Sequence, residues 1–173
     1  YEQSRKAPNT QSLNDAIAII MAKARYDGEE QPVFVRIGEL EGKIYLDLCN
    51  ENWGVVEIME DGWEIIPESP VKFIRSKSML PLSEPYKGGQ IEDLKEFLNI
   101  RDDSDFILVT AFLIASLRHK GPYPILNVQG EQGSGKSNFS WMLRSLTDPA
   151  IAPLRSQPNN ERDLMISATH SWM

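Results

Sequence analysis

The sequence has little of the chemistry that builds disulfide frameworks or metal centres. It contains one cysteine, Cys49, and two histidines, His119 and His170, among 173 residues. A single cysteine excludes an internal disulfide framework and is typical of the reducing cytosol. The two histidines lie far apart and have no companion ligands, which argues against a zinc site. We therefore expect a cytoplasmic protein in which Cys49, at the end of a predicted strand, is a buried structural thiol.

Long apolar runs and an excess of positive charge are also absent. The longest apolar run, residues 106–117, is shorter than the roughly 20 residues that cross a bilayer, so we expect no membrane partner. The net charge is −7, from 18 basic and 25 acidic residues, which argues against a surface coated with basic residues for nucleic acid. The sequence begins at Tyr1 with neither an initiator methionine nor a signal pattern, and we expect it to be a piece of a longer protein.

The most informative feature that is present is the run GEQGSGKS at residues 130–137, hereafter the phosphate loop. It matches the pattern G-x-x-x-x-G-K-[ST], known as Walker A. Gly130 and Gly135 let the backbone curl so that its N–H groups point at phosphate oxygens. Lys136 reaches the β- and γ-phosphates, and Ser137 offers its hydroxyl to Mg²⁺. We predict that ATP and Mg²⁺ bind here, with Ser137 as the metal ligand. The predicted nucleotide-binding residues are Gly130, Glu131, Gln132, Gly133, Ser134, Gly135, Lys136, Ser137 and Asn138.

The residues around the phosphate loop have the order strand, loop, helix that this chemistry needs. Residues 123–129 form a short apolar run after a Gly-Pro pair, as in a buried parallel strand. Apolar residues then recur at helical spacing over 139–146, and Asp148-Pro149 ends the helix. The positive end of that helix dipole faces the bound anion. The alternative, a glycine-rich surface turn that matches the pattern by chance, does not explain this order.

The N-terminal half has its own pattern, which begins with a helix. Residues 1–11 are polar and expected to be flexible. A capping box of Ser12 and Asp15 then predicts the start of an amphipathic helix, and Asp27-Gly28 predicts its end.

Residues 32–74 change to a period of two, which predicts a small antiparallel meander. Runs 33–37 and 44–48 should form one hairpin around Glu41-Gly42. Runs 53–60 and 63–66 should form a second hairpin around Asp61-Gly62, with Trp53 close to facing Trp63. A fifth strand is expected over 71–75.

A basic strip of Lys72, Arg75 and Lys77, with Phe73 between them, lies at the end of this sheet. It could contact a nucleic-acid backbone. A strand edge protected by lysine has the same pattern and is the more common case.

Prolines and glycines over residues 79–90 predict a linker between two folding units. Beyond it we expect a short helix from Ile91 and a second helix, capped by aspartates at 102–105, that runs to about Leu117. The second helix is apolar on almost every side, which predicts that it is buried. The expected organisation is a flexible N-terminus (1–11), a helix plus β-meander domain (12–78), the linker (79–90) and the N-terminal part of a truncated P-loop NTPase domain (91–173).

Several of these segments resemble a known group of proteins. The matching segments are 121–126, the phosphate loop, Asp148-Pro149 with 152–155, and 161–166, preceded by 35–37 and 44–48. They resemble ATP-binding proteins encoded by bacterial genomes, prophages and other mobile elements, over roughly residues 34–173. That group is similar to the helicase half of primase–helicase replication proteins. The resemblance implies a truncated α/β core of the RecA-like or AAA+ type behind an α+β front unit, and a role in DNA replication.

The sequence lacks the acid that nucleotide hydrolysis requires. Hydrolysis in this class needs an apolar strand ending in Asp or Glu, the Walker B acid, to hold Mg²⁺ and orient water. After Lys136 the acids are Asp148, Glu161 and Asp163, and none ends an apolar strand. We identify no catalytic residue. The parent protein is expected to be an ATPase, while this chain is expected to end inside the ATPase domain and to be inactive alone.

The favoured function is an NTP-driven motor that acts on nucleic acid, in a parent protein that is expected to form homo-oligomers. Two further classes of function compete with it. A phosphotransferase, or kinase, usually places its phosphate loop near the N-terminus, whereas this loop follows about 130 residues. A nucleotide-gated scaffold would bind and switch without turnover. Arg144, Arg155 and Arg162 are candidate contacts to phosphate or to a neighbouring subunit, but a salt bridge is the more common role and none is assigned.

Overall fold

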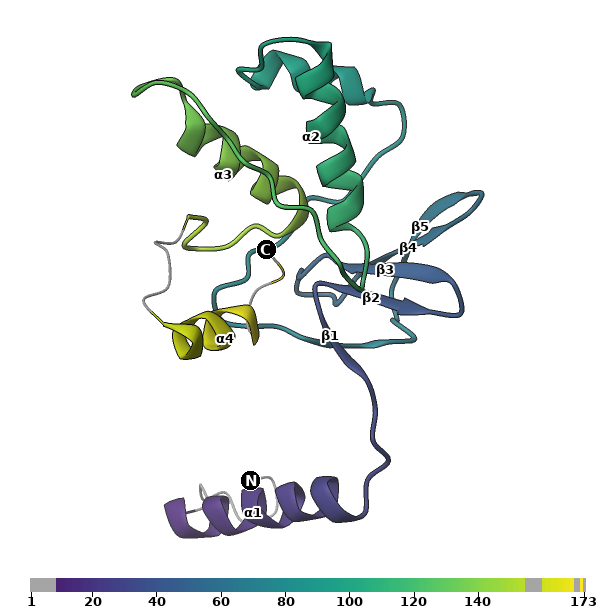
Figure 1. Cartoon of the computed structure of the whole chain (residues 1–173). Helices are drawn as coiled ribbons and strands as arrows, with labels where there is room; N and C mark the ends of the chain where they lie inside the picture. Colours follow the sequence, from purple (N-terminus) through teal and green to yellow (C-terminus); the bar gives the residue numbers. More distant parts are fainter. Residues whose placement is uncertain (1–8, 155–159, 170–171, 173) are drawn as a thin grey trace. The chain divides into compact units, whose positions relative to one another are not determined.

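A computed structural model describes residues 9–154, 160–169 and 172 of the chain (Figure 1). The fold is mixed α and β, with a four-stranded antiparallel sheet and a two-stranded parallel sheet. The chain divides into two compact units, Tyr1–Pro32 and Val33–Met173. Within the described residues, we find no helix with the length and apolar character that a bilayer-spanning segment requires.

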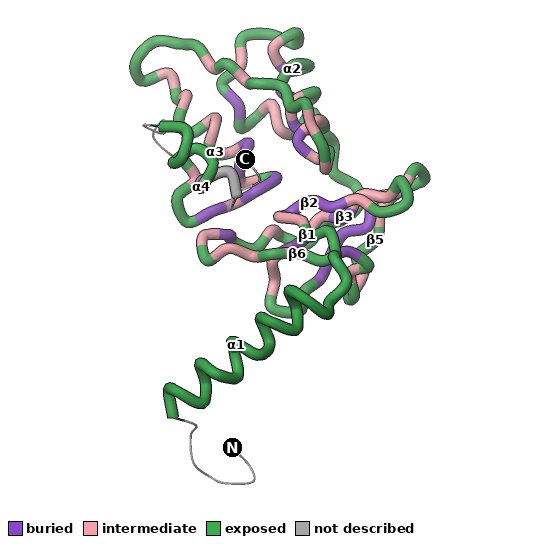
Figure 2. The backbone as a smooth tube through the Cα atoms, turned by 60° about the horizontal axis from the view of Figure 1, so that its bottom comes forward, coloured by how far each residue is buried: buried purple, intermediate pink, exposed green. Residues whose placement is uncertain are grey.

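The first unit contains one helix, α1 (Thr10–Tyr26). Its N-cap is Asn9, whose Oδ1 accepts a hydrogen bond from the Ser12 backbone N–H at 2.7 Å. The predicted capping box at Ser12 is therefore wrong, because an asparagine that caps at least as well lies three residues earlier. The predicted end is confirmed, since the N–H groups of Asp27 and Gly28 both donate to the Lys23 carbonyl. All residues of α1 are exposed (Figure 2).

In the second unit, the antiparallel sheet contains both predicted hairpins. Glu41 and Gly42 form the first turn, with φ of 53° and 82°, as a tight two-residue turn requires. The second turn is shifted by one residue to Glu60-Asp61, because Gly62 pairs with Met59. The strands, in sheet order, are β2 (Ile37–Leu40), β3 (Lys43–Asp47), β4 (Val55–Met59) and β5 (Gly62–Ile66).

The predicted first strand is interrupted at Arg36. This residue has a φ of 63°, in the left-handed region, and it turns the chain out of the antiparallel sheet. The residues before it form β1 (Val33–Val35), which pairs in parallel with β6 (Lys72–Ile74). The prediction of a five-strand meander is therefore wrong at both ends, since its first and last strands form a separate two-stranded sheet. No local turn signal marks Arg36. The break is stabilised instead by the burial of the Arg36 side chain.

The two tryptophans do not face each other as expected. Trp63 lies in β5 opposite Ile58. Trp53, with a φ of 57°, lies in the turn before β4, and the Arg75 guanidinium covers its ring at 3.7 Å from the ring centroid. A cation on the ring face therefore replaces the predicted pairing across the strands.

The later part of the chain contains a second apolar core. Leu98, Val109, Leu113 and Leu143 form this core, whereas Tyr45, Val55 and Val71 form the core of the sheet region. The helices of this part are η1 (Ile91–Phe97), a 3₁₀ helix, α2 (Asp103–Ser116), α3 (Lys136–Thr147) and α4 (Glu161–Thr169).

Helix α2 begins as predicted but is not buried on every side. Asp102 caps it, accepting from the Asp105 N–H at 3.1 Å. One face, with Phe106, Val109 and Leu113, is buried, but Ile107 and Ile114 are 66% and 65% exposed. The prediction of a wholly buried helix is thus wrong for the described residues, where only one face of α2 is covered.

The first residues of the predicted linker are tied to both sides of the second unit. Met79 is buried and forms an antiparallel bridge with Ala150 after α3. The Leu80 N–H donates to the Pro149 carbonyl at 2.9 Å, and the Leu82 N–H donates to the Leu48 carbonyl after β3 at 2.9 Å. The division of the chain at residues 79–90 stays a prediction, and these bonds restrict any free linker to the residues after Leu82.

A buried charge cluster of Arg36, Asp47, Arg75, Arg144 and Asp148 connects the sheets to the end of α3. Arg36 is fully buried, and its Nε donates to Asp148 Oδ1 at 3.1 Å. Arg144 donates to the same carboxylate at 3.3 Å, and Arg75 donates to Asp47 Oδ2 at 2.8 Å. Arg36 also donates to the carbonyls of Asp47 and Leu80, each at 3.0 Å. Each buried charge thus has an opposite charge beside it, as burial requires.

Candidate functional site

The phosphate loop connects an extended segment to the first turn of α3. Gly133 and Gly135 have φ of 84° and 83°, a conformation that residues with a Cβ atom adopt only with strain. Gly135 is the N-cap of α3, which begins at Lys136. At Gly130, an added Cβ atom would lie 2.6 Å from Ser134 Oγ. Of the two glycines predicted to curl the loop, Gly135 has a backbone conformation that favours glycine, and Gly133 has one as well. At Gly130 the close neighbour is a side-chain hydroxyl, which can rotate away.

Lys136 binds the carbonyls of its own loop. Its Nζ donates to the carbonyl oxygens of Gly130 at 2.8 Å and Glu131 at 2.6 Å, and reaches Ser134 Oγ at 3.4 Å. Among the described residues, no carboxylate pairs with this ammonium group. Its positive charge is thus held inside the loop and available to an anion.

The backbone N–H groups at the start of α3 are also suited to bind an anion. The first N–H groups of a helix have no partner within the helix. Here the N–H groups of Gly135, Lys136 and Ser137 donate to no acceptor among the described residues. Together with the helix dipole and the Lys136 charge, they favour a group that carries several negative oxygens.

Asn99 holds the loop through a hydrogen bond from a distant part of the chain. Its Nδ2 donates to the Ser134 carbonyl at 3.1 Å, across 35 positions of sequence. Asn99 lies between η1 and α2, so the packing of these helices determines where Ser134 lies. Sequence reasoning missed this contact, because nothing local marks an asparagine whose partner is distant in the chain.

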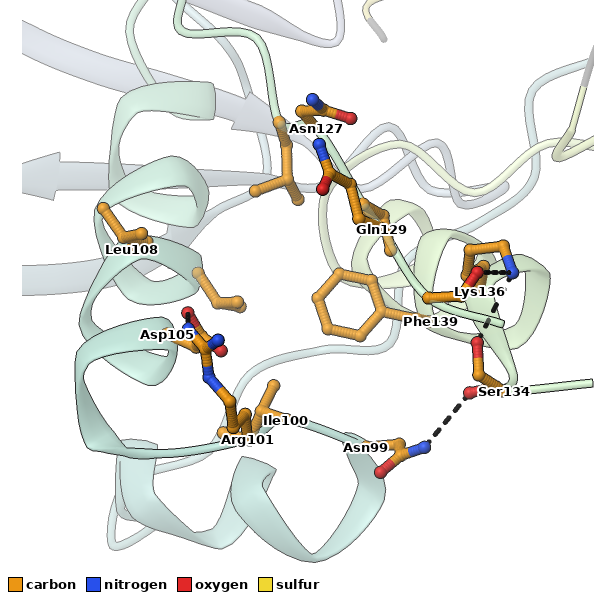
Figure 3. A pocket seen from close by; sticks show the side chains of 14 residues that line it. Asn99, Ile100, Arg101, Asp105, Leu108, Asn127, Gln129, Ser134, Lys136 and Phe139 are labelled. Carbon is orange, nitrogen blue, oxygen red and sulfur yellow. Dashed lines mark hydrogen bonds and ion pairs between the residues drawn. The ribbon is translucent and has the colours of Figure 1, made fainter. Parts of the chain in front are cut away.

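A pocket of about 470 Å³ opens directly beside the loop (Figure 3). Gly130, Ser134 and Lys136 line one end of it, and α2 and α3 line its sides. Figure 3 shows the ring of Phe139 projecting from α3 into this space. The other lining residues are Asn99, Ile100, Arg101, Asp105, Leu108, Val109, Leu126, Asn127, Val128 and Gln129.

The segment before the loop is extended but has no strand partner among the described residues. Residues 122–131 carry no strand assignment, and Ile125 is 94% exposed. The prediction of a buried parallel strand over 123–129 is therefore wrong for the described part of the chain. A parallel strand is buried only when neighbouring strands and helices cover it, and the described residues supply no such neighbours.

Comparison with protein families, with curated proteins and with solved structures finds no match to this chain. The functional assignment therefore rests on the phosphate loop and its surroundings. The P-loop NTPase core remains a proposal, because the described strands belong to the N-terminal sheets.

The acids that follow the loop lie at the end of α3 and at the start of α4. Asp148 is buried between Arg36 and Arg144, while Glu161 and Asp163 lie in the first turn of α4. In the described part of the chain, no group of three His, Cys, Asp or Glu side chains could hold a metal ion. Ser137 thus remains the predicted magnesium ligand, with the nucleotide expected to bring the ion.

The other candidate residues have structural environments. Arg144 belongs to the charge cluster, Arg162 lies in α4, and Arg155 lies outside the described residues. In the basic strip, Arg75 binds Asp47 and covers Trp53, whereas Lys72 and Lys77 are exposed.

Cys49 is less buried than the sequence predicts, and His119 lies beside a carboxylate. Cys49 is half-buried, and burial raises the pKa of its thiol, which keeps it protonated at neutral pH. His119 Nε2 lies 3.0 Å from Glu39 Oε2, and His170 lies outside the described residues.

Proposed function

We propose that the phosphate loop binds the triphosphate of a nucleotide, ATP with Mg²⁺. The observation that carries the proposal is the position of Lys136 Nζ, 2.6–2.8 Å from two loop carbonyls and without a carboxylate partner among the described residues. An incoming phosphate would compete with the loop carbonyls for the hydrogen bonds of this ammonium group. It would also accept hydrogen bonds from the N–H groups of the first turn of α3. Ser137, next to Lys136, would contribute its hydroxyl to Mg²⁺.

We further propose that the parent protein is an NTP-driven motor on nucleic acid, of the helicase type found in replication. Support comes from the resemblance over residues 34–173 and from the late position of the loop in the chain. The finer description, a RecA-like or AAA+ core, is part of this proposal.

The site as described favours binding without turnover. Of the acids after Lys136, Asp148 pairs with Arg36 and Arg144, and Glu161 and Asp163 lie in the first turn of α4, so none of the three ends a strand as a Walker B acid does. We propose that hydrolysis uses an acid from another part of the parent protein.

Nucleotide binding can be tested on the 173-residue chain with a fluorescent ATP analogue and Mg²⁺. Replacing Lys136 by alanine removes charge-assisted hydrogen bonds, so we expect affinity to fall at least tenfold. The control is Lys77→Ala, which removes an exposed lysine remote in sequence from the loop and should leave affinity unchanged. Equal affinity of Lys136→Ala and the unmodified chain would contradict the proposal. Phosphate release in the same samples should stay at background.

A further inference from the structure

The pocket beside the phosphate loop is continuous with the phosphate site. Gly130, Ser134 and Lys136 belong to the loop and also line the pocket. Phe139 lies three residues after Lys136 on α3, which places it about 4.5 Å further along the helix and on the same side. A ligand whose phosphates lie at the loop therefore has the rest of its structure next to this pocket.

Part of the pocket wall is apolar and includes one aromatic ring, that of Phe139. Phe139 is half-buried and packs against the core that contains Val109 and Leu143, which fixes its position. Its ring projects into the space between α3 and α2 (Figure 3), and Ile100 and Leu126 line the pocket with it. An aromatic ring and aliphatic side chains around a narrow space are the surfaces on which a planar heteroaromatic base stacks.

Away from Lys136, the polar lining residues of the pocket include uncharged amides. Gln129 and Asn127 come from the extended segment and line the pocket, and Figure 3 shows the Gln129 amide on the side of Asn127 rather than at the ring of Phe139. An amide both donates and accepts hydrogen bonds, as the edge of a base requires. The one arginine in the pocket, Arg101, is paired with Asp102 at 3.1 Å and with Asp105 at 3.4 Å. Positive charge is thus concentrated on Lys136, at the end where the loop lies.

We propose that this pocket binds the base of the nucleotide, with Phe139 as its stacking surface and Gln129 at the edge of the base. The inference rests on the proposed nucleotide function and adds a prediction to it. The chain should distinguish a nucleoside triphosphate from an inorganic triphosphate, because most residues that line the pocket lie outside the phosphate loop.

The experiment compares ATP with inorganic tripolyphosphate on the 173-residue chain, both with Mg²⁺, by isothermal titration. We expect the unmodified chain to bind ATP more tightly than tripolyphosphate. Phe139→Ala should lower the affinity for ATP about tenfold while leaving that for tripolyphosphate unchanged. Gln129→Ala, at an exposed position, should act in the same direction with a smaller effect. Phe139→Tyr should preserve the preference for ATP.

Trp141→Ala is the matched control, because Trp141 is an aromatic residue of α3 that is 51% exposed and does not line the pocket. The deciding quantity is the ratio of the two affinities, which is insensitive to a loss of folded protein. An unchanged ratio in Phe139→Ala, or equal affinity of the unmodified chain for both ligands, overturns the base pocket. Failure of the proposed function has a different result, in which neither ligand binds or Lys136→Ala affects neither.

Discussion

At the scale of single residues, the sheet contains a hydrogen bond from Tyr45 to Glu57, a carboxylate whose charge changes with pH. The Tyr45 hydroxyl donates to Glu57 Oε1 at 2.8 Å, and Lys43 Nζ lies 3.1 Å from the same oxygen. The bond from Tyr45, followed by that from Lys43, lowers the pKa of Glu57 below its usual value of 4.5. Burial and the bond to Glu57 raise the pKa of Tyr45 to about 12, so its hydroxyl stays a donor at neutral pH.

The lowered pKa predicts a loss of stability in acid. A carboxyl group with a lower pKa in the folded state stabilises the fold above its unfolded pKa, and this contribution disappears as pH falls through the folded value. Urea unfolding should therefore show Tyr45→Phe less stable than the unmodified chain at pH 7, with the difference shrinking below about pH 4.5. Tyr123→Phe is the control. A difference that stays constant from pH 7 to pH 3 would show that the bond does not depend on the charge of Glu57.

At the scale of the elements, turn signals and periodicity predicted more than packing did. Both hairpins, the end of α1 and the start of α2 follow from local residues such as Gly42, Gly28 and Asp102. The break at Arg36 could not be predicted, because it depends on an ion pair with Asp148, 112 positions away. At the site, the motif predicted the position of the loop. The hydrogen bond from Asn99 to Ser134 could not be predicted, because it depends on tertiary packing.

The cap of α1 gives a prediction at this scale. Asn9 Oδ1 is the acceptor at the helix start, so Asn9→Ala should destabilise α1 by about 1 kcal/mol and unwind its first turn. Because α1 lies in a unit of its own, the measurement is hydrogen exchange of the α1 amides rather than global unfolding. Ser12→Ala should have little effect. The opposite ranking of the two variants would restore the capping box predicted from the sequence.

At the scale of the whole molecule, the charge cluster makes the sheets and α3 depend on each other. Arg36→Met should destabilise the second unit by about 3–5 kcal/mol, because it leaves buried acceptors without their donor. Arg101→Ala removes a guanidinium that is 80% exposed and should leave stability nearly unchanged. Thermal unfolding of both variants checks the contrast. Similar melting temperatures would mean that the buried pair contributes no more than the exposed one.

The division into two units predicts where the chain is cut first. Residues 27–32 are exposed and carry no helix or strand, and they end where the second unit begins. The sequence places the linker at 79–90 instead, but Met79, Leu80 and Leu82 are bound on both sides. Limited digestion with a glutamate-specific protease should therefore cleave at Glu29 or Glu30 before Glu84, as mass spectrometry would show. Earlier cleavage at Glu84 would favour the division at 79–90.

The long separation of Arg36 from Asp148 also bears on how the chain is synthesised. A ribosome completes β1 to β6 well before it adds Asp148, 112 residues after Arg36. Until α3 has emerged, the Arg36 guanidinium lacks its carboxylate partner and cannot be buried without a large electrostatic cost. The sheet region therefore cannot reach its final packing while the nascent chain ends before α3 and Asp148. The helix that follows the phosphate loop thus completes the packing of strands that were synthesised before it.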